Sequence, residues 1–247
     1  MKTYSIIFLT FISQTLFSQT NVNSFIASYK ILIDDASLLS SKEKINKSDN
    51  EVYKMLSNEY LNTIVQCKDL IKFELIYNKS EMIYYRKEFV IPDFFNDVQK
   101  GIAESFKLSS FYYNFNTKYY VEYFKFIDKN YNLLIDFESI NWEITAETKL
   151  INGFLCYKAI HNNGKYSIPL VVWFAPEISF QVGPEKCQFL PGLVLEYQLK
   201  DFSIVCEKIN FNPTVEDLKK LMQPKGIDIT QHELDVMITK TKEAQRN

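Results

Sequence analysis

The chain has 247 residues, of which 15% are aromatic, and a formal net charge of −2 at pH 7. This slightly acidic balance argues against nucleic acid, or an anionic membrane surface, as a partner recognised through net charge. The length suits one domain, or one domain with an appendage, that buries its core without help from a metal or a disulfide.

The first eighteen residues have the organisation of a secretory signal peptide. Lys2 gives a positive start, an apolar run extends from Tyr4 to Phe17, and Ser18 is the small residue expected before the cut. An N-terminal core strand is the alternative. No cysteine lies near the cut to accept a lipid, and no later segment reaches the roughly 20 apolar residues of a transmembrane helix. We expect an exported mature domain, residues 19–247, with no transmembrane segment. The polar C-terminus favours the periplasm over the extracellular medium.

Aromatic-rich segments of alternating polarity predict strands along the first half of the mature chain. The first strand covers residues 25–33. Residues 35–66 then form a polar helical or loop insertion, with a mobile stretch over 40–50 followed by a helix. Another helix is expected over residues 93–106, which present an apolar face. Further strands are predicted at residues 71–77, 82–85, 111–113, 119–124 and 133–137.

The second half is expected to contain two more hairpins. Asn163 and Gly164 supply the positive φ angles of a tight turn, which joins a strand at 153–160 to a return strand ending at 171–174. The other hairpin pairs residues 193–198 with residues 202–211.

The C-terminal residues 214–244 change to a helical pattern. Thr214 caps a first helix, a break follows at 224–226, and a capping box at Thr230 and Glu233 opens a second helix. The fold class is therefore mainly β (α+β). We expect a large curved antiparallel sheet or partial barrel with an early helical insertion and two C-terminal helices.

One region carries a family pattern. Residues 189–194 read Phe-Leu-Pro-Gly-Leu-Val, after a tryptophan strand, a Glu-x-Lys-x-Ile-x-Gly-Phe-x-Cys-x-Lys-Ala run, a Trp-Phe-Ala-Pro-Glu-Ile run and a Gly-Pro pair. In order and spacing this pattern resembles the GLPGLI family, exported proteins known mainly from Bacteroidota. Phe189 replaces the first glycine of the naming segment. The residues that carry the resemblance are Trp142, Glu147, Lys149, Gly153, Cys156, Lys158, Trp173, Pro176, Glu177, Gly183, Pro184, Leu190, Pro191, Gly192 and Leu193.

The resemblance implies a β-rich envelope protein and transfers no catalytic residue. By analogy, its architecture is similar to the open, curled sheets of periplasmic lipoprotein carriers. The motif itself is predicted to be structural. Pro191 and Gly192 fit the central positions of a type II turn, which needs a positive φ at the glycine. Leu190 and Leu193 flank this turn and are expected to pack against the core.

Candidate sites for chemistry are few. Glu177, Glu185 and Glu196 bracket the motif and are the one set of carboxylates considered for acid–base or glycosidic chemistry. His161 and His232 are expected to be solvated. We predict no cofactor and no metal site, because the cysteine and histidine spacings match no zinc pattern.

The four cysteines and two tryptophans each have two interpretations. Cys67, Cys156, Cys187 and Cys206 allow disulfides in an oxidising compartment, with buried free thiols as the alternative. Trp142 and Trp173, together with the tyrosines, line a pocket for an apolar ligand or a glycan in one interpretation and belong to the core in the other.

Two functions from different classes remain open. The first is a non-enzymatic envelope protein that binds a hydrophobic ligand, a lipid or a partner segment on a curved sheet. The second is a hydrolase that uses acidic residues near the Leu-Pro-Gly-Leu motif. An apolar concavity favours the first, and carboxylates that converge in a cleft favour the second.

Overall fold

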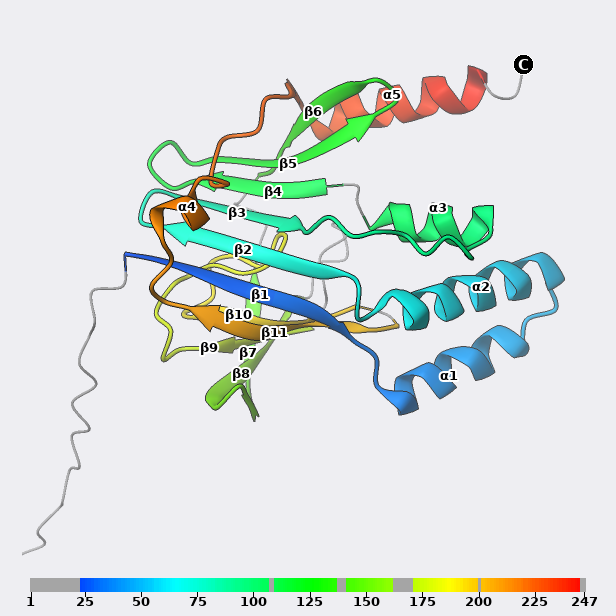
Figure 1. Ribbon diagram of the computed structural model, residues 1–247, viewed down its shortest axis with the longest axis horizontal. Coiled ribbons are helices and arrows are strands. Elements are labelled where there is room, and N and C mark those ends of the chain that lie inside the picture. The colour runs from blue at the N-terminus through cyan, green and yellow to red at the C-terminus, as the bar shows by residue number, and fades with distance from the viewer. Residues whose placement is uncertain (1–22, 107–108, 137–140, 162–170, 200, 245–247) are drawn as a thin grey trace, which may run out of the picture.

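The computed structural model describes residues 23–106, 109–136, 141–161, 171–199 and 201–244, and Figure 1 shows their arrangement. The signal peptide predicted at residues 1–18 lies outside these ranges. The elements in chain order are β1 (Ser24–Leu32), α1 (Asp35–Asn46), α2 (Glu51–Cys67), β2 (Lys72–Asn78), β3 (Glu81–Arg86), α3 (Asp97–Ser105), β4 (Ser109–Asn114), β5 (Tyr119–Phe126), β6 (Lys129–Leu134), β7 (Trp142–Ile151), β8 (Phe154–His161), β9 (Val171–Ala175), β10 (Leu193–Gln198), β11 (Ser203–Asn210), α4 (Val215–Leu218), β12 (Ile227–Ile229) and α5 (Gln231–Ala244).

The described strands form one large, curved sheet in the order β12-β6-β5-β4-β3-β2-β1-β11-β10-β9-β8-β7. Neighbouring strands are antiparallel, except that β12 runs parallel to β6. The predicted mainly β class is therefore confirmed. In the described part of the chain, no helix has the length and apolar character needed to cross a membrane.

Short turns with asparagine join the hairpins. The side-chain oxygen of Asn78 accepts the backbone N–H groups of Ser80 and Glu81, at 2.7 and 2.8 Å, between β2 and β3. Asn114 makes the equivalent turn before β5. Such local bonds reverse the chain without tertiary help, and the predicted hairpins at these positions are confirmed.

One hairpin turn was not predicted. Asn152 and Gly153 have φ angles of 52° and 83° and join β7 to β8. Asn-Gly is the dipeptide that a primed turn requires, so the signal for this turn was present in the sequence. The predicted Asn163-Gly164 turn lies outside the described residues, although β8 and β9, which flank it, do pair antiparallel.

Two helical predictions need correction. The stretch predicted to be mobile over residues 40–50 is largely helix α1, because Asp34 caps it and Ser41 donates a hydrogen bond to Asp201 at 2.9 Å. The first predicted C-terminal helix is reduced to the single turn α4. The chain that follows is held against β6, where Asn132 donates to the carbonyl of Gly226 at 3.2 Å, and forms β12 instead.

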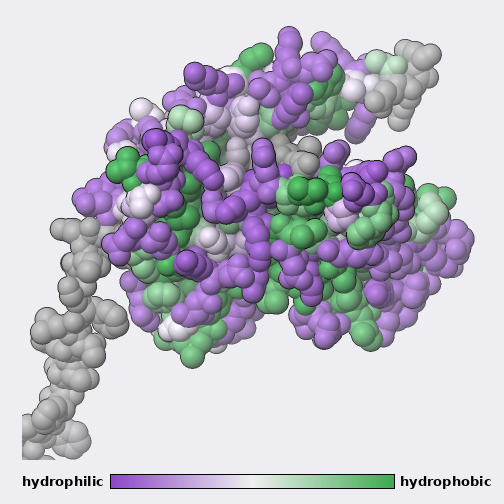
Figure 2. Space-filling view, in the orientation of Figure 1, coloured by the Kyte–Doolittle hydropathy of each residue, from purple (hydrophilic) through white to green (hydrophobic). Residues whose placement is uncertain are grey.

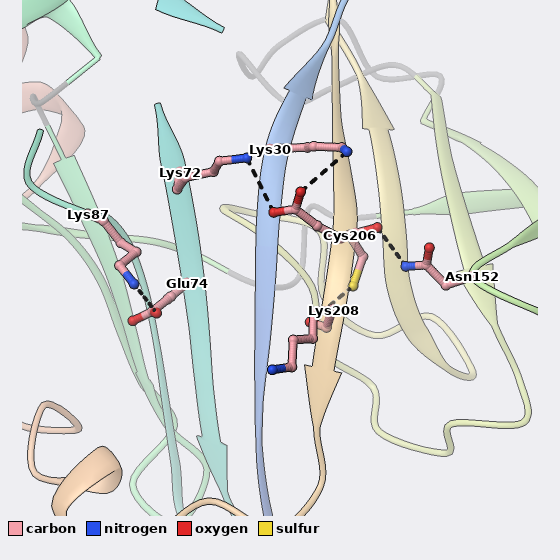
Figure 3. A network of polar contacts seen from close by, with 8 residues as sticks. Lys30, Lys72, Glu74, Lys87, Asn152, Cys206 and Lys208 are labelled. Atoms are coloured by element: carbon pink, nitrogen blue, oxygen red, sulfur yellow. Dashed lines mark hydrogen bonds and ion pairs between the residues drawn. The ribbon is translucent and has the colours of Figure 1, made fainter. Parts of the chain in front are cut away.

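The two faces of the sheet differ in polarity. The inner face carries Phe25, Tyr29, Phe73, Tyr84 and Phe111, all buried. The outer face carries ion pairs: Lys30 and Lys72 both approach Glu207, at 3.4 and 3.3 Å, and Glu74 binds Lys87 at 2.8 Å (Figure 3). The outer face thus carries charged pairs, although Ile76, Tyr112 and Val121 on the same face are buried. Figure 2 shows a largely hydrophilic surface over α1, α2 and α5, with a hollow between α5 and α3.

Candidate functional site

Residues 176–192, here called the inner loop, join β9 to β10 and lie against the inner face of the sheet. The Phe180 ring is 5.1 Å from the ring of Phe25 on β1 and 4.9 Å from that of Tyr77 on β2. Tyr120 on β5 donates its hydroxyl proton to the carbonyl of Glu185. The inner loop thus contacts strands from several parts of the sheet and fills much of its concave side.

The Leu-Pro-Gly-Leu turn lies within this inner loop, but it is not the predicted type II turn. Gly192 has no positive φ, and its N–H binds the carbonyl of Leu190 at 2.8 Å. A hydrogen bond to the residue two positions earlier defines a γ-turn. The ring of Pro191, the central residue, fixes the negative φ that the inverse γ-turn requires. A Cβ on Gly192 would lie 2.3 Å from the Ala175 carbonyl oxygen. Glycine is therefore required here for close approach to β9.

The positive φ belongs to Phe189 instead, at 69°. This is the position where the resemblance places a glycine. Phe189 therefore adopts a left-handed conformation that glycine would adopt without steric cost. The half-exposed Phe189 ring makes an edge contact with Tyr113, with centroids 6.5 Å apart.

We expect Phe189→Gly to unfold with a free energy about 1 kcal/mol higher than Phe189→Ala. Both variants lose the aromatic ring, so the ring contact cancels in the comparison. Only glycine avoids the steric cost of a left-handed conformation. Urea denaturation of the two variants measures the difference, and an alanine variant as stable as the glycine variant would show that the backbone is unstrained here.

The charged motif residues meet on the outer face near β7, β8 and β10. Lys149 binds the buried Glu196 at 2.7 Å and lies 4.3 Å above the ring of Trp173. Lys158 binds Glu147 at 2.8 Å. These groups are neutralised by one another, which leaves none of them directed into the concave side of the sheet.

The remaining motif residues support the inner loop. Trp142 donates its indole N–H to the carbonyl of Gln188 at 2.9 Å. Gly183 is packed so tightly that a Cβ would lie 2.5 Å from the carbonyl oxygen of Cys187, and Pro184 beside it is buried. Pro176 and Glu177 form an exposed turn after β9.

His161 is not solvated, contrary to the prediction. It is 1% exposed, and its Nδ1 lies 2.8 Å from the carbonyl oxygen of Asn141, because β8 places it beneath Trp142. His232 is exposed as expected.

The four cysteines are free and buried. Burial raises the pKa of Cys156 to about 11 and that of Cys206 to about 12. A thiol with such a pKa is hardly ionised near neutral pH and is a poor nucleophile. The structure therefore matches the buried-thiol interpretation.

The three carboxylates singled out from the sequence do not converge. Glu177 is exposed in a turn, Glu196 is paired with Lys149, and Glu185 alone faces the concave side. The structure instead places Glu122 of β5 near Glu185, where it pairs with Lys186 at 3.4 Å. Sequence reasoning missed Glu122. Its position between Tyr120 and Phe124 could have identified it, because side chains two residues apart in a strand lie on the same face.

Glu185 belongs to a buried network of tyrosines. Tyr197 donates its hydroxyl to Glu185 Oε1 at 2.8 Å, and the hydroxyl oxygens of Tyr84 and Tyr197 are 3.5 Å apart. Burial raises the pKa of the Glu185 carboxyl, the hydrogen bond from Tyr197 opposes this rise, and the charge of Glu122 adds to it. A carboxyl in such a setting favours its neutral form.

This raised pKa predicts a specific pH dependence of stability. The unfolded chain releases the Glu185 proton near the ordinary value of 4.5, whereas the folded chain holds it to higher pH. Above about pH 4.5 the folded state therefore binds more protons than the unfolded state, and the Glu185 contribution to stability is lost as pH rises through the folded pKa. We expect Glu185→Gln to remove this component, so that the difference in unfolding free energy between variant and parent grows with pH. A constant difference in urea denaturation across this range would contradict the assignment.

Three neighbouring cavities open around the inner loop and strands β3 to β6. The Glu185 cavity has a volume of about 540 Å³, and its lining combines apolar side chains with Glu185, Glu122, two lysines, Ser109 and Gln231. The Phe202 cavity, of about 160 Å³, shares Ser109, Phe111 and Glu185 with it. The Arg86 cavity, of about 500 Å³, shares Ser109, Phe124 and Lys125 with it. The apolar walls of the Glu185 cavity come from Phe111, Phe124, Phe126, Leu133, Leu234 and Ile238.

The apolar residues of α5 that line the Glu185 cavity are only half-buried. Leu234 and Ile238 lie one turn apart on the helix and so share a face, and that face is directed into the cavity. Neither Trp142 nor Trp173 lines any of the three cavities. Trp173 is buried in the hydrophobic core and Trp142 packs against that core, which matches the core interpretation of these two residues.

Comparison with known proteins gives a fold and no family. No protein-family model matches the chain, and no curated protein is similar to it in sequence. Two solved structures are similar, titled "Structure of PNGF-II in P21 space group" and "Structure of PNGF-II in C2 space group". Both have a TM-score of 0.51, and they are 13% and 12% identical to this chain. The match covers 88% of this chain and 33% of each of those chains, so this chain spans about a third of their length. The likeness is one of fold alone.

Proposed function

We propose that this chain is an exported envelope protein of GLPGLI type, with a signal peptide at residues 1–18 and a periplasmic location, that binds an apolar ligand without chemical conversion. The observation that carries the proposal is the Glu185 cavity. Its volume of about 540 Å³ lies within the usual range of roughly 300–1,000 Å³ for small-molecule sites. Half of its lining residues are apolar or aromatic, and side chains of this kind dominate the lining of such sites.

The half-buried apolar face of α5 supports the same proposal. Leu234 and Ile238 would be more completely covered if the cavity held an apolar occupant. Burial of apolar surface contributes roughly 25 cal/mol per Å², so an occupant that covers these side chains and the facing phenylalanines would bind favourably.

A pair of variants on α5 tests the proposal. Ile238→Lys places a charge in the Glu185 cavity, whereas Val236→Lys places the same charge on the same helix at a residue that does not line it. We expect the parent and Val236→Lys to enhance the fluorescence of a naphthylamine probe of apolar sites, and Ile238→Lys to bind it at least about tenfold more weakly. Equal probe binding by both variants would place the ligand elsewhere.

Native mass spectrometry of the protein purified from its own envelope is the complementary measurement. We expect a mass shift from a co-purifying lipid or other apolar molecule, lost on gentle organic extraction. A clean apo mass, together with no probe binding, would contradict the proposal.

A hydrolase remains a second candidate, and one observation favours it. Glu185 and Glu122 line the same cavity, and the pKa of Glu185 is raised by burial, as suits a general acid beside a second carboxyl group. This candidate predicts turnover of chromogenic glycosides or esters that Glu185→Gln abolishes and Glu177→Gln, in the exposed turn, leaves intact. Turnover that survives Glu185→Gln would exclude this cavity as its site.

A further inference from the structure

Arg86, the last residue of β3, has donors without acceptors. Its Nε and Nη1 atoms are buried, and neither has a hydrogen-bond partner in the described part of the chain. The guanidinium carbon lies 4.6 Å from the centre of the Phe89 ring. Burial lowers the pKa of Arg86, an effect that the charge of Glu88 opposes.

Such an arrangement is costly unless an acceptor arrives from outside the chain. Guanidinium stays charged in proteins and has five N–H donors in a planar fork. Burying a charged donor without a partner costs free energy, and carboxylate and phosphate oxygens fit the fork best. The neighbouring Lys87 does not line the cavity that Arg86 lines, and it binds Glu74 on the outer face.

The cavity that Arg86 lines contains charged and hydroxyl groups that can bind an anionic head. Lys125 adds a second positive charge, and Ser109, Ser110 and Tyr123 add hydroxyl groups. Glu104 is the carboxylate in this lining, so the charged side chains sum to one net positive charge. The neighbouring Glu185 cavity differs in two respects: it has six apolar side chains in its lining, and its Glu122 is neutralised by Lys186.

The two cavities meet at Ser109, Phe124 and Lys125, which line both. The apolar side chains of the Glu185 cavity are therefore adjacent to the charged and hydroxyl side chains of the Arg86 cavity. This juxtaposition fits a ligand with two parts of opposite character better than a uniformly apolar one.

We propose that the ligand is an amphipathic anion, whose apolar chain occupies the Glu185 cavity and whose carboxylate or phosphate head binds the guanidinium of Arg86. The proposal rests on the proposed function and adds the chemical class of the ligand. Lys125 contributes attraction from the rim of the Arg86 cavity.

The test compares three ligands with the same apolar chain: decanoate, decyl phosphate and decanol, each below its aggregation concentration. Calorimetric titration of the parent protein is expected to show one or both anions bound at least about tenfold more tightly than the alcohol. Preference for one anion over the other identifies the head as a carboxylate or a phosphate.

Arg86→Met, which keeps the apolar stem and removes the guanidinium, is expected to bind the anions no more tightly than the alcohol. Lys87→Met is the matched control, because it removes the neighbouring charge on the opposite face and is expected to keep the full preference. Thermal unfolding monitors whether each variant folds, and the comparison within the parent protein does not depend on the variants.

The outcomes separate the two proposals. If the parent binds decanol as tightly as both anions, or if Arg86→Met is folded and keeps the preference, the anion assignment is wrong while apolar binding stands. If the parent binds none of the three and also fails to bind the naphthylamine probe, the proposed function itself is wrong.

Discussion

Replacing Gly192 with alanine is expected to lower the free energy of unfolding by about 3 kcal/mol. The added Cβ would lie 2.3 Å from the carbonyl oxygen of Ala175, 2.6 Å from its carbonyl carbon and 2.8 Å from the nitrogen of Pro176. All three contacts are backbone atoms at the end of β9, so no side-chain rotation can relieve them. The inner loop would have to move away from the sheet and lose the buried contacts of Leu190 and Leu193.

Gly101→Ala is the matched control for this prediction. Gly101 lies in α3, and a Cβ there would meet nothing within 4 Å. Alanine is favoured over glycine inside a helix by about 1 kcal/mol, so this substitution is expected to stabilise the protein. Urea denaturation, with circular dichroism to confirm folding, measures both effects. A Gly192→Ala variant as stable as the parent would show that the loop does not approach β9 this closely.

The second large effect is expected at the pair formed by Lys149 and Glu196. Lys149→Met should lower the unfolding free energy by about 2 to 3 kcal/mol. Glu196 is only 5% exposed, and without Lys149 its carboxylate keeps the hydrogen bond from the side-chain amide of Gln198 at 3.3 Å. The partial exposure of Lys149 itself, at 33% of its side chain, brings the cost below the roughly 3–5 kcal/mol expected when a fully buried pair is broken.

Lys158→Met gives the comparison for an exposed pair on the same hairpin. Its partner Glu147 is 60% exposed, and such pairs contribute only about 0 to 1 kcal/mol. In a double-mutant cycle, adding Glu196→Gln to Lys149→Met should recover part of the loss, because no buried charge then remains. If Lys149→Met lowers the unfolding free energy no more than Lys158→Met does, the prediction is wrong and Glu196 does not carry a buried, unpaired charge.

Features held by local bonds could be predicted from the sequence. The turns at Asn78 and Asn114 and the capping box at Thr230 and Glu233 depend on side chains within three residues of the groups they bind. Alternation of apolar and polar residues likewise located β1, because one face of that strand is buried throughout. The turn at Asn152 and Gly153 belongs to the same class, and it was missed although its signal was present.

Features that depend on distant partners were predicted wrongly or not at all. Helix α1 lacks a clear apolar face, and its tertiary bond to Asp201 joins residues far apart in the chain. The strand β12 exists because Asn132 binds the backbone beside it. The turn at Gly192 was assigned from Pro-Gly chemistry alone, whereas the approach of β9 decides its conformation.

The candidate site shows the same division. From the sequence came a mainly β, curved sheet, an aromatic-rich interior and Glu185 as one of three acidic candidates, together with an exported family pattern that stays a prediction. Only the tertiary structure separated Glu185 from Glu177 and Glu196, brought Glu122 to it from β5, and left the donors of Arg86 without acceptors. The physical reason is that a residue's chemistry is local, whereas its burial and its charged neighbours are set by strands that meet only when the sheet curls around the inner loop.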